Sequence, residues 1–330
     1  MFDLVTFGEA MIRLSPPNFS RLEQTTSLDV NIGGAELNVA VTASRMGLKT
    51  SFITRLTQNP LGRMLANKAR EQGVDTSHIL WSEGDKVGIY FYEFGALPRP
   101  STVLYDRANS AMAKLEPGMF DWDSVFAETQ AFHVTGITPA LSKNTAEATK
   151  EALSKAREAG LMISFDLNYR SRLWTTKQAN SILSPLMKYV DILMATQDDA
   201  IQVLKVKGKN YEEIAHKLVE SFGFKTVAIT MSSTGMVAGK NLAAITYHDG
   251  QLYEGRKYEV QIIDRLGAGD AFAGAFLYAY ISGEGNAEKA LNYGVAASAL
   301  KHSYPGDINW CTREEVERLI ANGVSGAVSR

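Results

Sequence analysis

Short apolar runs alternate with amphipathic helical patterns along most of this 330-residue chain. The alternation is typical of an α/β protein, in which helices cover both faces of a mostly parallel sheet. The runs expected to form strands are residues 3–7, 50–54, 131–135, 161–166, 190–194, 225–230 and 257–263. Helices are expected at residues 35–47, 60–72, 143–159, 175–188, 197–205, 210–222, 269–282, 286–302 and 312–321. The pattern predicts one large α/β domain over residues 1–330.

Two stretches, residues 9–32 and 85–107, interrupt this alternation. The second stretch reads as two strands, Gly88–Phe94 and Thr102–Tyr105, joined by a turn that contains glycine and proline. Together the stretches predict a small β-sheet outside the main one. Because α/β folds bind ligands at the carboxyl ends of their strands, we expect this sheet to form a lid over that edge. Sheet edges also pair readily, so we expect a homo-oligomer that assembles through the lid.

Composition excludes several classes of protein. The net charge of −2 and the pI near 6.3 give no basic surface for nucleic acid or an anionic membrane. The single cysteine, Cys311, excludes an internal disulfide and a cysteine-rich metal site. No run is long enough to span a bilayer, and the first residues lack a signal peptide, so we expect a cytoplasmic protein.

One segment, from Ile262 to Gly274, combines an apolar run, a glycine-rich turn and the start of a helix of small residues. Glycines let backbone amides approach an anion, and amides at a helix N-terminus carry partial positive charge. A phosphoryl group would bind at Gly267, Ala268 and Gly269, and Asp270 would take the proton from an attacking hydroxyl. The alternative is that Asp270 only caps the helix.

A second glycine pair, Gly33-Gly34, precedes a helix in which Asn38 lies about one turn from the start. A ligand can approach the backbone at such glycines, although they are also ordinary turn residues. The chain contains neither GxGxxG nor GxxxxGK[ST], so the sequence does not support a dinucleotide site or that type of phosphate loop.

These two segments, Gly33-Gly34 with Asn38 and Asp264 to Asp270, resemble the two signature regions of the ribokinase-like (PfkB) carbohydrate kinases. Their spacing is also similar, and the resemblance extends from Asp3 to about Leu319. It implies a Rossmann-like three-layer α/β fold with a small β-sheet lid, and an ATP-dependent sugar kinase that uses Mg²⁺. Asp270 would be the general base, and the amides of residues 267–269 would stabilise the transferred group.

Within that family the chain is most similar to the 2-keto-3-deoxygluconate kinases, which phosphorylate a terminal hydroxyl to give 2-keto-3-deoxy-6-phosphogluconate. The similarity rests on Tyr90, the segments 105–111 and 166–170, and Tyr304 to Asp307. It implies a sugar-acid site formed by Gly34, Asn38, Tyr90, Tyr105, Arg107, Arg170 and Asp307. Arginine suits a carboxylate because its planar fork matches that group, although both arginines could instead be solvated surface charges. The alternatives are a fructokinase or another sugar kinase of the family and, from another class, a non-catalytic sugar-acid sensor.

The resemblance also implies a nucleotide site, for which the competing interpretation is a plain turn after residues 226–229. Its residues would be Asn168, Thr230, Ser232, Ser233, Thr234, Gly235, Gly267 and Gly269, with adenine near Asn292, Ala296 and Ala299. Where the family usually has Asn-x-x-Glu, this chain has Thr196-Gln197-Asp198-Asp199. Asp199 would therefore contact Mg²⁺ through water, and the binding of the ion would depend mainly on the ATP phosphates. Arg265-Leu266 replaces a common Thr-Thr pair, which puts the monovalent cation of some relatives in doubt.

Overall fold

A computed structural model describes residues 1–232 and 240–323. Within these ranges the main sheet has ten strands, in the order β13-β12-β11-β10-β9-β8-β1-β4-β5, with β14 paired to β12. The strands are β1 Phe2–Phe7, β4 Thr50–Thr57, β5 Ile79–Ser82, β8 Thr129–Thr135, β9 Met162–Asp166, β10 Ile192–Thr196, β11 Thr226–Ser232, β12 Lys240–His248, β13 Gln251–Glu254 and β14 Tyr258–Val260. Neighbours from β5 to β11 are parallel, whereas β12, β13 and β14 pair antiparallel.

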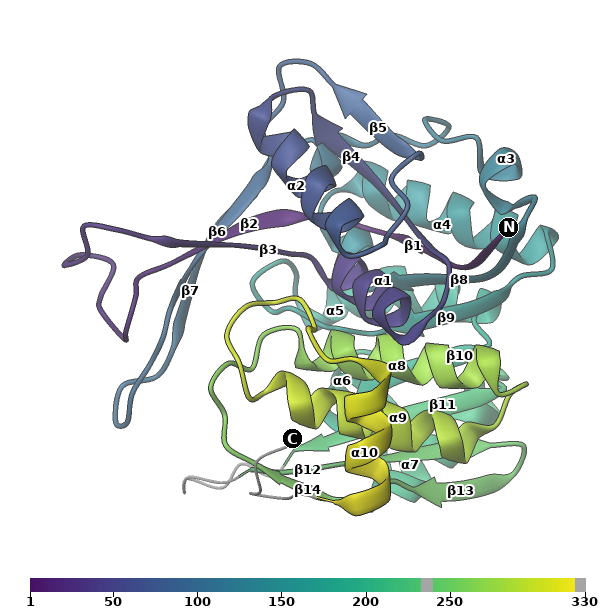
Figure 1. Ribbon diagram of the computed structural model, residues 1–330. Coiled ribbons are helices and arrows are strands. Elements are labelled where there is room, and N and C mark those ends of the chain that lie inside the picture. Colours follow the sequence, from purple (N-terminus) through teal and green to yellow (C-terminus); the bar gives the residue numbers. More distant parts are fainter. Residues whose placement is uncertain (233–239, 324–330) are drawn as a thin grey trace.

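Helices cover both faces of this sheet, as Figure 1 shows. Those that share one hydrophobic core are α3 Trp122–Phe126, α4 Lys143–Glu158, α5 Thr176–Leu183, α6 Gln197–Gln202 and α7 Tyr211–Phe222. The opposite core contains α1 Ala35–Met46, α8 Ala268–Ser282, α9 Ala287–Lys301 and α10 Arg313–Asn322. A third cluster packs α2 Pro60–Glu71 against α1 and β4. The sheet and the helices on its two faces form three layers, which confirms the predicted α/β fold class.

A second, small sheet has the strand order β3-β2-β6-β7 and extends to one side of the main body (Figure 1). Its strands are β2 Met11–Ser15, β3 Asp29–Gly33, β6 Gly88–Glu93 and β7 Thr102–Asp106. They come from the two stretches that interrupt the alternation. Cross-strand register places Asn31, Arg13, Tyr90 and Tyr105 in one row, and Val30, Leu14, Phe91 and Leu104 in the next. Because side chains alternate along a strand, the two rows lie on opposite faces.

The structure corrects part of the predicted element pattern. The strand expected at residues 257–263 is only Tyr258–Val260, and it pairs antiparallel with β12. The last residues of the expected strand pair with no strand among the described residues. Instead, the amide of Ile263 donates to the carbonyl of His302, just after α9, at 2.8 Å. The helix expected over 175–188 ends at Leu183, and a 3₁₀ helix, Ser184–Tyr189, follows it. Among the described residues, no helix is both long and apolar enough to cross a membrane.

Candidate active site

The turn before α8 is shaped by the loop that follows α9. Gly267 has a φ of +75°, and a Cβ there would lie 1.9 Å from the carbonyl oxygen of Asp307, so only glycine fits. The amides of Gly267, Gly269 and Asp270 have no acceptor within the described ranges, and they lie at the start of a 15-residue helix. Unpaired amides at the positive end of a helix form a site for an anion.

Asp270 lies in the first turn of α8, and Asn38 of α1 holds its carboxylate. Asn38 Nδ2 donates to Asp270 Oδ2 at 2.7 Å. Burial raises the pKa of Asp270 to about 6, against the opposing effects of the Asn38 hydrogen bond and the Arg170 charge. At neutral pH the carboxylate is thus ionised, yet it binds a proton more strongly than an ordinary aspartate, as a general base requires. Asn38 Oδ1 is buried and has no donor in the part of the chain that the structure describes.

A cavity of about 200 Å³, here called the central cavity, lies in front of these amides. It brings together seven predicted site residues, namely Asn168, Arg170, Asp199, Thr230, Gly267, Gly269 and Asp270. Asp166, at the end of β9, also lines it, although the sequence analysis assigned Asp166 no role. Burial and the charges of Asp270 and Asp199 raise the pKa of Asp166 to about 8, while Arg170 opposes the shift. The carboxylates of Asp166, Asp199 and Asp270 therefore line this cavity together with two exposed arginines, Arg170 and Arg265.

An adjoining cavity of about 230 Å³ shares Thr230, Arg265, Gly269 and Phe272 with the central cavity, and Ala268 lines it as well. Its α9 wall consists of Val295, Ser298 and His302 rather than the expected Asn292, Ala296 and Ala299. The helix is turned so that Ala296 and Ala299 pack in the hydrophobic core, while Asn292 accepts a hydrogen bond from the Arg256 amide. Ser232 ends β11, and the predicted Ser233, Thr234 and Gly235 lie outside the described residues.

On the other side of the site, Arg13 of β2 ties the small sheet to the main body. Its guanidinium donates to Asp307 at 3.0 Å and to Asp264 at 2.8 Å, and all three side chains are buried. Tyr90 of β6 donates to the other oxygen of Asp307. Asp264 also accepts from the amides of Leu266 and Gly306, both at 3.0 Å. Arg13 was not among the predicted site residues, although a charged residue within the apolar run of residues 11–14 was a signal of a buried partner.

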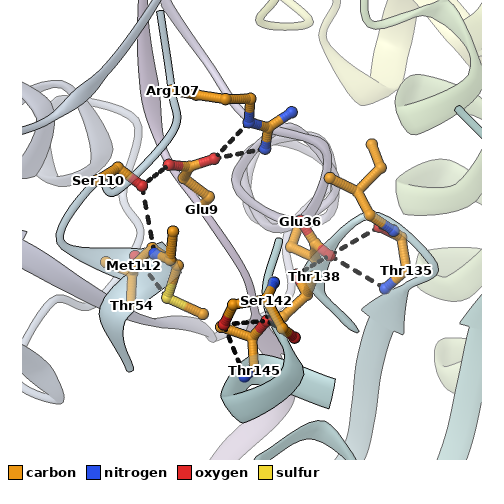
Figure 2. Close-up of polar contacts among 12 residues, drawn as sticks. Glu9, Glu36, Thr54, Arg107, Ser110, Met112, Thr135, Thr138, Ser142 and Thr145 are labelled. Atoms are coloured by element: carbon orange, nitrogen blue, oxygen red, sulfur yellow. Dashed lines mark hydrogen bonds and ion pairs between the residues drawn. The ribbon is translucent and has the colours of Figure 1, made fainter. Parts of the chain in front are cut away.

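Arg107 follows β7 and is also buried and paired. Its Nε donates to Glu9 Oε2 at 2.9 Å, its Nη2 contacts the same oxygen, and Ser110 donates to Oε1, as Figure 2 shows. The guanidinium lies 5.6 Å from the ring centre of Tyr105, which is 37% exposed. The arginine expected to meet a sugar acid thus already has an anionic partner within the protein.

Glu36, in the first turn of α1, fixes the start of the helix that carries Asn38 (Figure 2). Its buried carboxylate accepts from the Thr135 amide at 3.1 Å and from the hydroxyls of Thr135 and Thr138, both at 2.7 Å. Burial raises its pKa to about 7, although these donors lower it. Since Thr135 ends β8, the contacts join the Gly33-Gly34 segment to the carboxyl edge of the main sheet.

Other predicted sugar residues lie apart from the two cavities. Gly34, Tyr90, Tyr105, Arg107 and Asp307 line neither the central nor the adjoining cavity, and they cluster on the small-sheet side. A larger groove of about 650 Å³ between α4 and α5 contains none of the predicted site residues that the structure describes. The site therefore has two parts, and Asn38 and the loop at Asp307 lie where they meet.

The residues present fit a divalent cation that is bound mainly by nucleotide phosphates. Asp166 and Asp199 both face the central cavity, and the pKa of each is raised chiefly by burial. A nearby cation would stabilise their charged forms, and carboxylate oxygens are the ligands that Mg²⁺ prefers. Within the described ranges, however, no three His, Cys, Asp or Glu side chains are grouped to hold a metal.

Comparison with known proteins identifies the family. The model of the family described as "pfkB family carbohydrate kinase" matches residues 1–314. The 2-dehydro-3-deoxygalactonokinase of Haloferax volcanii is 41% identical over 324 residues, which cover 98% of each chain. Among solved structures, the 2-dehydro-3-deoxygluconokinase of Thermotoga maritima is 41% identical, has a TM-score of 0.94 and aligns over 98% of this chain and 100% of its own.

A more distant structure shares the fold. A putative ribokinase II from E. coli in complex with ATP and Mg²⁺ is 22% identical, with a TM-score of 0.85 over 97% of this chain and 99% of its own. It supports the ribokinase-like architecture predicted from the two glycine-containing segments.

Proposed function

Because the chain belongs to the pfkB family of carbohydrate kinases, we propose that it phosphorylates the terminal hydroxyl of 2-keto-3-deoxygluconate with ATP. The general activity, phosphoryl transfer to an alcohol, is that of its named relatives. The observation that carries the proposal is the position of Asp270 beside unpaired amides in a cavity that adjoins a second one. The product would be 2-keto-3-deoxy-6-phosphogluconate.

In the proposed reaction, Asp270 takes the proton of the terminal hydroxyl while that oxygen forms a bond to the γ-phosphorus. The bond from the γ-phosphorus to the bridging oxygen of ADP breaks, and ADP leaves with the electron pair. Asn38 holds the Asp270 carboxylate and offers its free Oδ1 to a substrate hydroxyl. The amides of Gly267 and Gly269 stabilise charge on the transferred group, which is the main source of catalysis in phosphoryl transfer.

ATP would occupy the two cavities, with Thr230 and Gly269 at their junction and Asn168 on the wall of the central cavity. Asp199, together with Asp166, would hold Mg²⁺ through water next to the nucleotide phosphates. When bound, the ion neutralises the polyphosphate charge.

The substrate class rests on the arginines and on the relatives. Arg170 is exposed in the central cavity, and its one described hydrogen bond is to the carbonyl of Tyr169 at 3.2 Å. Although its charge acts on Asp166, Asp199 and Asp270, Arg170 forms no ion pair with a described residue, so it can bind the carboxylate of a sugar acid, whereas Arg107 is paired with Glu9. One relative is named for the gluconate and one for the galactonate acid, which supports a 2-keto-3-deoxy acid as the substrate. Both epimers therefore need to be tested.

The small sheet would act as the lid of this single domain and as its oligomer interface. Its outer face carries a row of apolar side chains in which Val30 is 56% and Leu104 is 61% exposed. An exposed apolar row of this kind favours pairing with a second copy. Light scattering on the wild type and on Leu104→Lys tests this: a dimer or larger species should dissociate in the variant, and a monomeric wild type would contradict it.

The proposed function is tested by ADP release with Mg-ATP and four sugars: 2-keto-3-deoxygluconate, its galactonate epimer, fructose and ribose. Selective turnover of a keto-deoxy acid is the expected result. Preference for fructose or ribose would keep the kinase activity and overturn the proposed substrate. If the protein binds ATP but turns over none of the four, a non-catalytic sugar-acid sensor becomes the better explanation.

A further inference from the structure

Glu9 lies at the junction of the two sheets, in the segment between the end of β1 and the start of β2. Its side chain is only 3% exposed, although carboxylates are seldom buried without a strong partner. Glu9 was not among the predicted site residues, and it takes no part in the proposed chemistry. Its burial therefore needs an explanation.

The contacts of Glu9 all involve segments that carry predicted sugar residues. Its carboxylate holds Arg107 and Ser110, which follow β7. A Cβ at Gly34 would lie 2.2 Å from the Glu9 carbonyl oxygen, and a Cβ at Gly88 would lie 2.8 Å from Oε1. The start of α1, the start of β6 and the chain beyond β7 thus all pack against this one residue.

The pairing leaves one part of Arg107 available. Nε and Nη2 face Glu9, whereas Figure 2 shows the remaining guanidinium nitrogen, Nη1, pointing away from the carboxylate. No described residue accepts a hydrogen bond from Nη1. A buried arginine fixed through two of its nitrogens presents the third in a defined direction, because the planar fork moves as a unit.

We infer that Glu9 is a positioning residue that orients Arg107 and balances its charge, so that Nη1 alone is offered to a neutral oxygen of the substrate. The inference rests on the proposed function, in which Arg107 contacts the sugar. It assigns the two arginines different tasks: Arg170 binds the carboxylate of the acid, and Arg107 binds a hydroxyl or keto oxygen.

The test is a double-mutant cycle of Glu9→Gln and Arg107→Leu, with Glu93→Gln as the matched control. Glu93 is also a buried glutamate paired with an arginine, Arg99, and it lies at the far end of β6. Loss of a charge-assisted contact predicts that Glu9→Gln raises the sugar KM about tenfold, with the ATP KM unchanged within about twofold. Glu93→Gln should leave both KM values unchanged.

If Glu9 acts through Arg107, then Arg107→Leu in the Glu9→Gln background raises the sugar KM by less than about twofold further. Additive losses, or equal changes in the KM values for sugar and ATP, would overturn the inference. The assay uses whichever sugar of the panel the wild type turns over, so a wrong substrate proposal does not affect it.

A second measurement needs no turnover. In NMR spectra of arginine side-chain N–H groups, the Arg107 signal is assigned by its loss in Arg107→Leu. The signal should be protected from solvent exchange in the wild type and in Glu93→Gln, and unprotected in Glu9→Gln. Equal protection in Glu9→Gln would overturn the inference even if the protein phosphorylates no sugar of the panel.

Discussion

The central cavity and the small-sheet side of the site differ in whether their polar groups have partners within the protein. In and beside the cavity, the amides of Gly267, Gly269 and Asp270 and the Oδ1 atom of Asn38 have no partner among the described residues. Three carboxylates line the cavity together with the exposed Arg170 and Arg265. On the small-sheet side, Arg13 and Arg107 are buried and paired with carboxylates. Unpaired polar groups are costly in a folded protein, so they are retained where a ligand completes them. Paired groups fix geometry instead.

This contrast leads to a general expectation. Substitutions in the central cavity should reduce activity and leave stability intact, because the native contacts there are incomplete without ligands. Substitutions among the paired groups should reduce stability first, because they leave a buried charge without its partner.

Asp270→Ala tests the cavity side. Removing the base should lower kcat by about 10²–10⁴-fold, the usual contribution of general-base catalysis, while the KM for ATP changes far less. The melting temperature should not fall, since the residue removed is a carboxylate whose charged form is disfavoured by burial. Steady-state kinetics and calorimetry measure these quantities. Equal loss of turnover and ATP binding in a folded variant would contradict the role of Asp270 as a base.

Arg13→Leu tests the paired side. The substitution leaves Asp264 and Asp307 buried without their shared cation, which should lower the free energy of unfolding by about 3–5 kcal/mol. Urea denaturation measures the change. A variant as stable as the wild type would show that the ion pairs do not hold the small sheet in place.

Arg170→Leu makes the same substitution at an arginine that has no ion-pair partner among the described residues. We expect the KM for the keto-deoxy acid to rise about tenfold or more, since a charge-assisted pair is lost, with little change for a neutral sugar. Stability should be unchanged. Arg172→Leu is the matched control, because Arg172 is exposed two residues away and does not line the cavity. Equal penalties for acid and neutral sugars would remove Arg170 from the binding of the carboxylate.

The change of kcat/KM with pH should be smaller than the effects of these three substitutions. Because the pKa of Asp270 is about 6, its carboxyl group is protonated below that pH and cannot accept a proton. Activity should therefore rise by up to about tenfold per pH unit below 6 and level off above it. Asp166, with a pKa of about 8, faces the same cavity, so the rise is also measured in Asp166→Asn. Loss of the rise in that variant would assign it to Asp166.

The sequence predicted the parts of the fold that depend on local pattern. Six of its expected strands correspond to β1, β4, β8, β9, β10 and β11, which together with β5 form the parallel part of the sheet. The pattern missed β5, β12 and β13 and overestimated β14. β5 and β13 are short edge strands without the continuous buried runs of central strands, whereas β12 contains the buried Leu242, Ala244 and Ile245 and was overlooked.

The residues of the site also fall into those that a local sequence pattern could predict and those that it could not. The glycines of both signature segments, with Asp270 and Asn38, could be found from the sequence because their chemistry is local. Arg13 could not be assigned a role, since its partners Asp264 and Asp307 lie 251 and 294 residues away. Glu9 was missed for the same reason, because 98 residues separate it from Arg107.

The position of Asp307 also constrains how this chain can change during evolution. Only five residues connect the end of α9 to Asp307, whose carbonyl packs on Gly267 and whose carboxylate meets Arg13 and Tyr90. An insertion or deletion in this connection would shift both contacts together. In the turn between β6 and β7, residues 94–101, Arg99 pairs with Glu93 and donates to the Phe19 carbonyl at 2.7 Å, so both of its contacts stay within the small sheet and its loops. We therefore expect homologues to keep the length of the first connection while the second accumulates insertions and deletions.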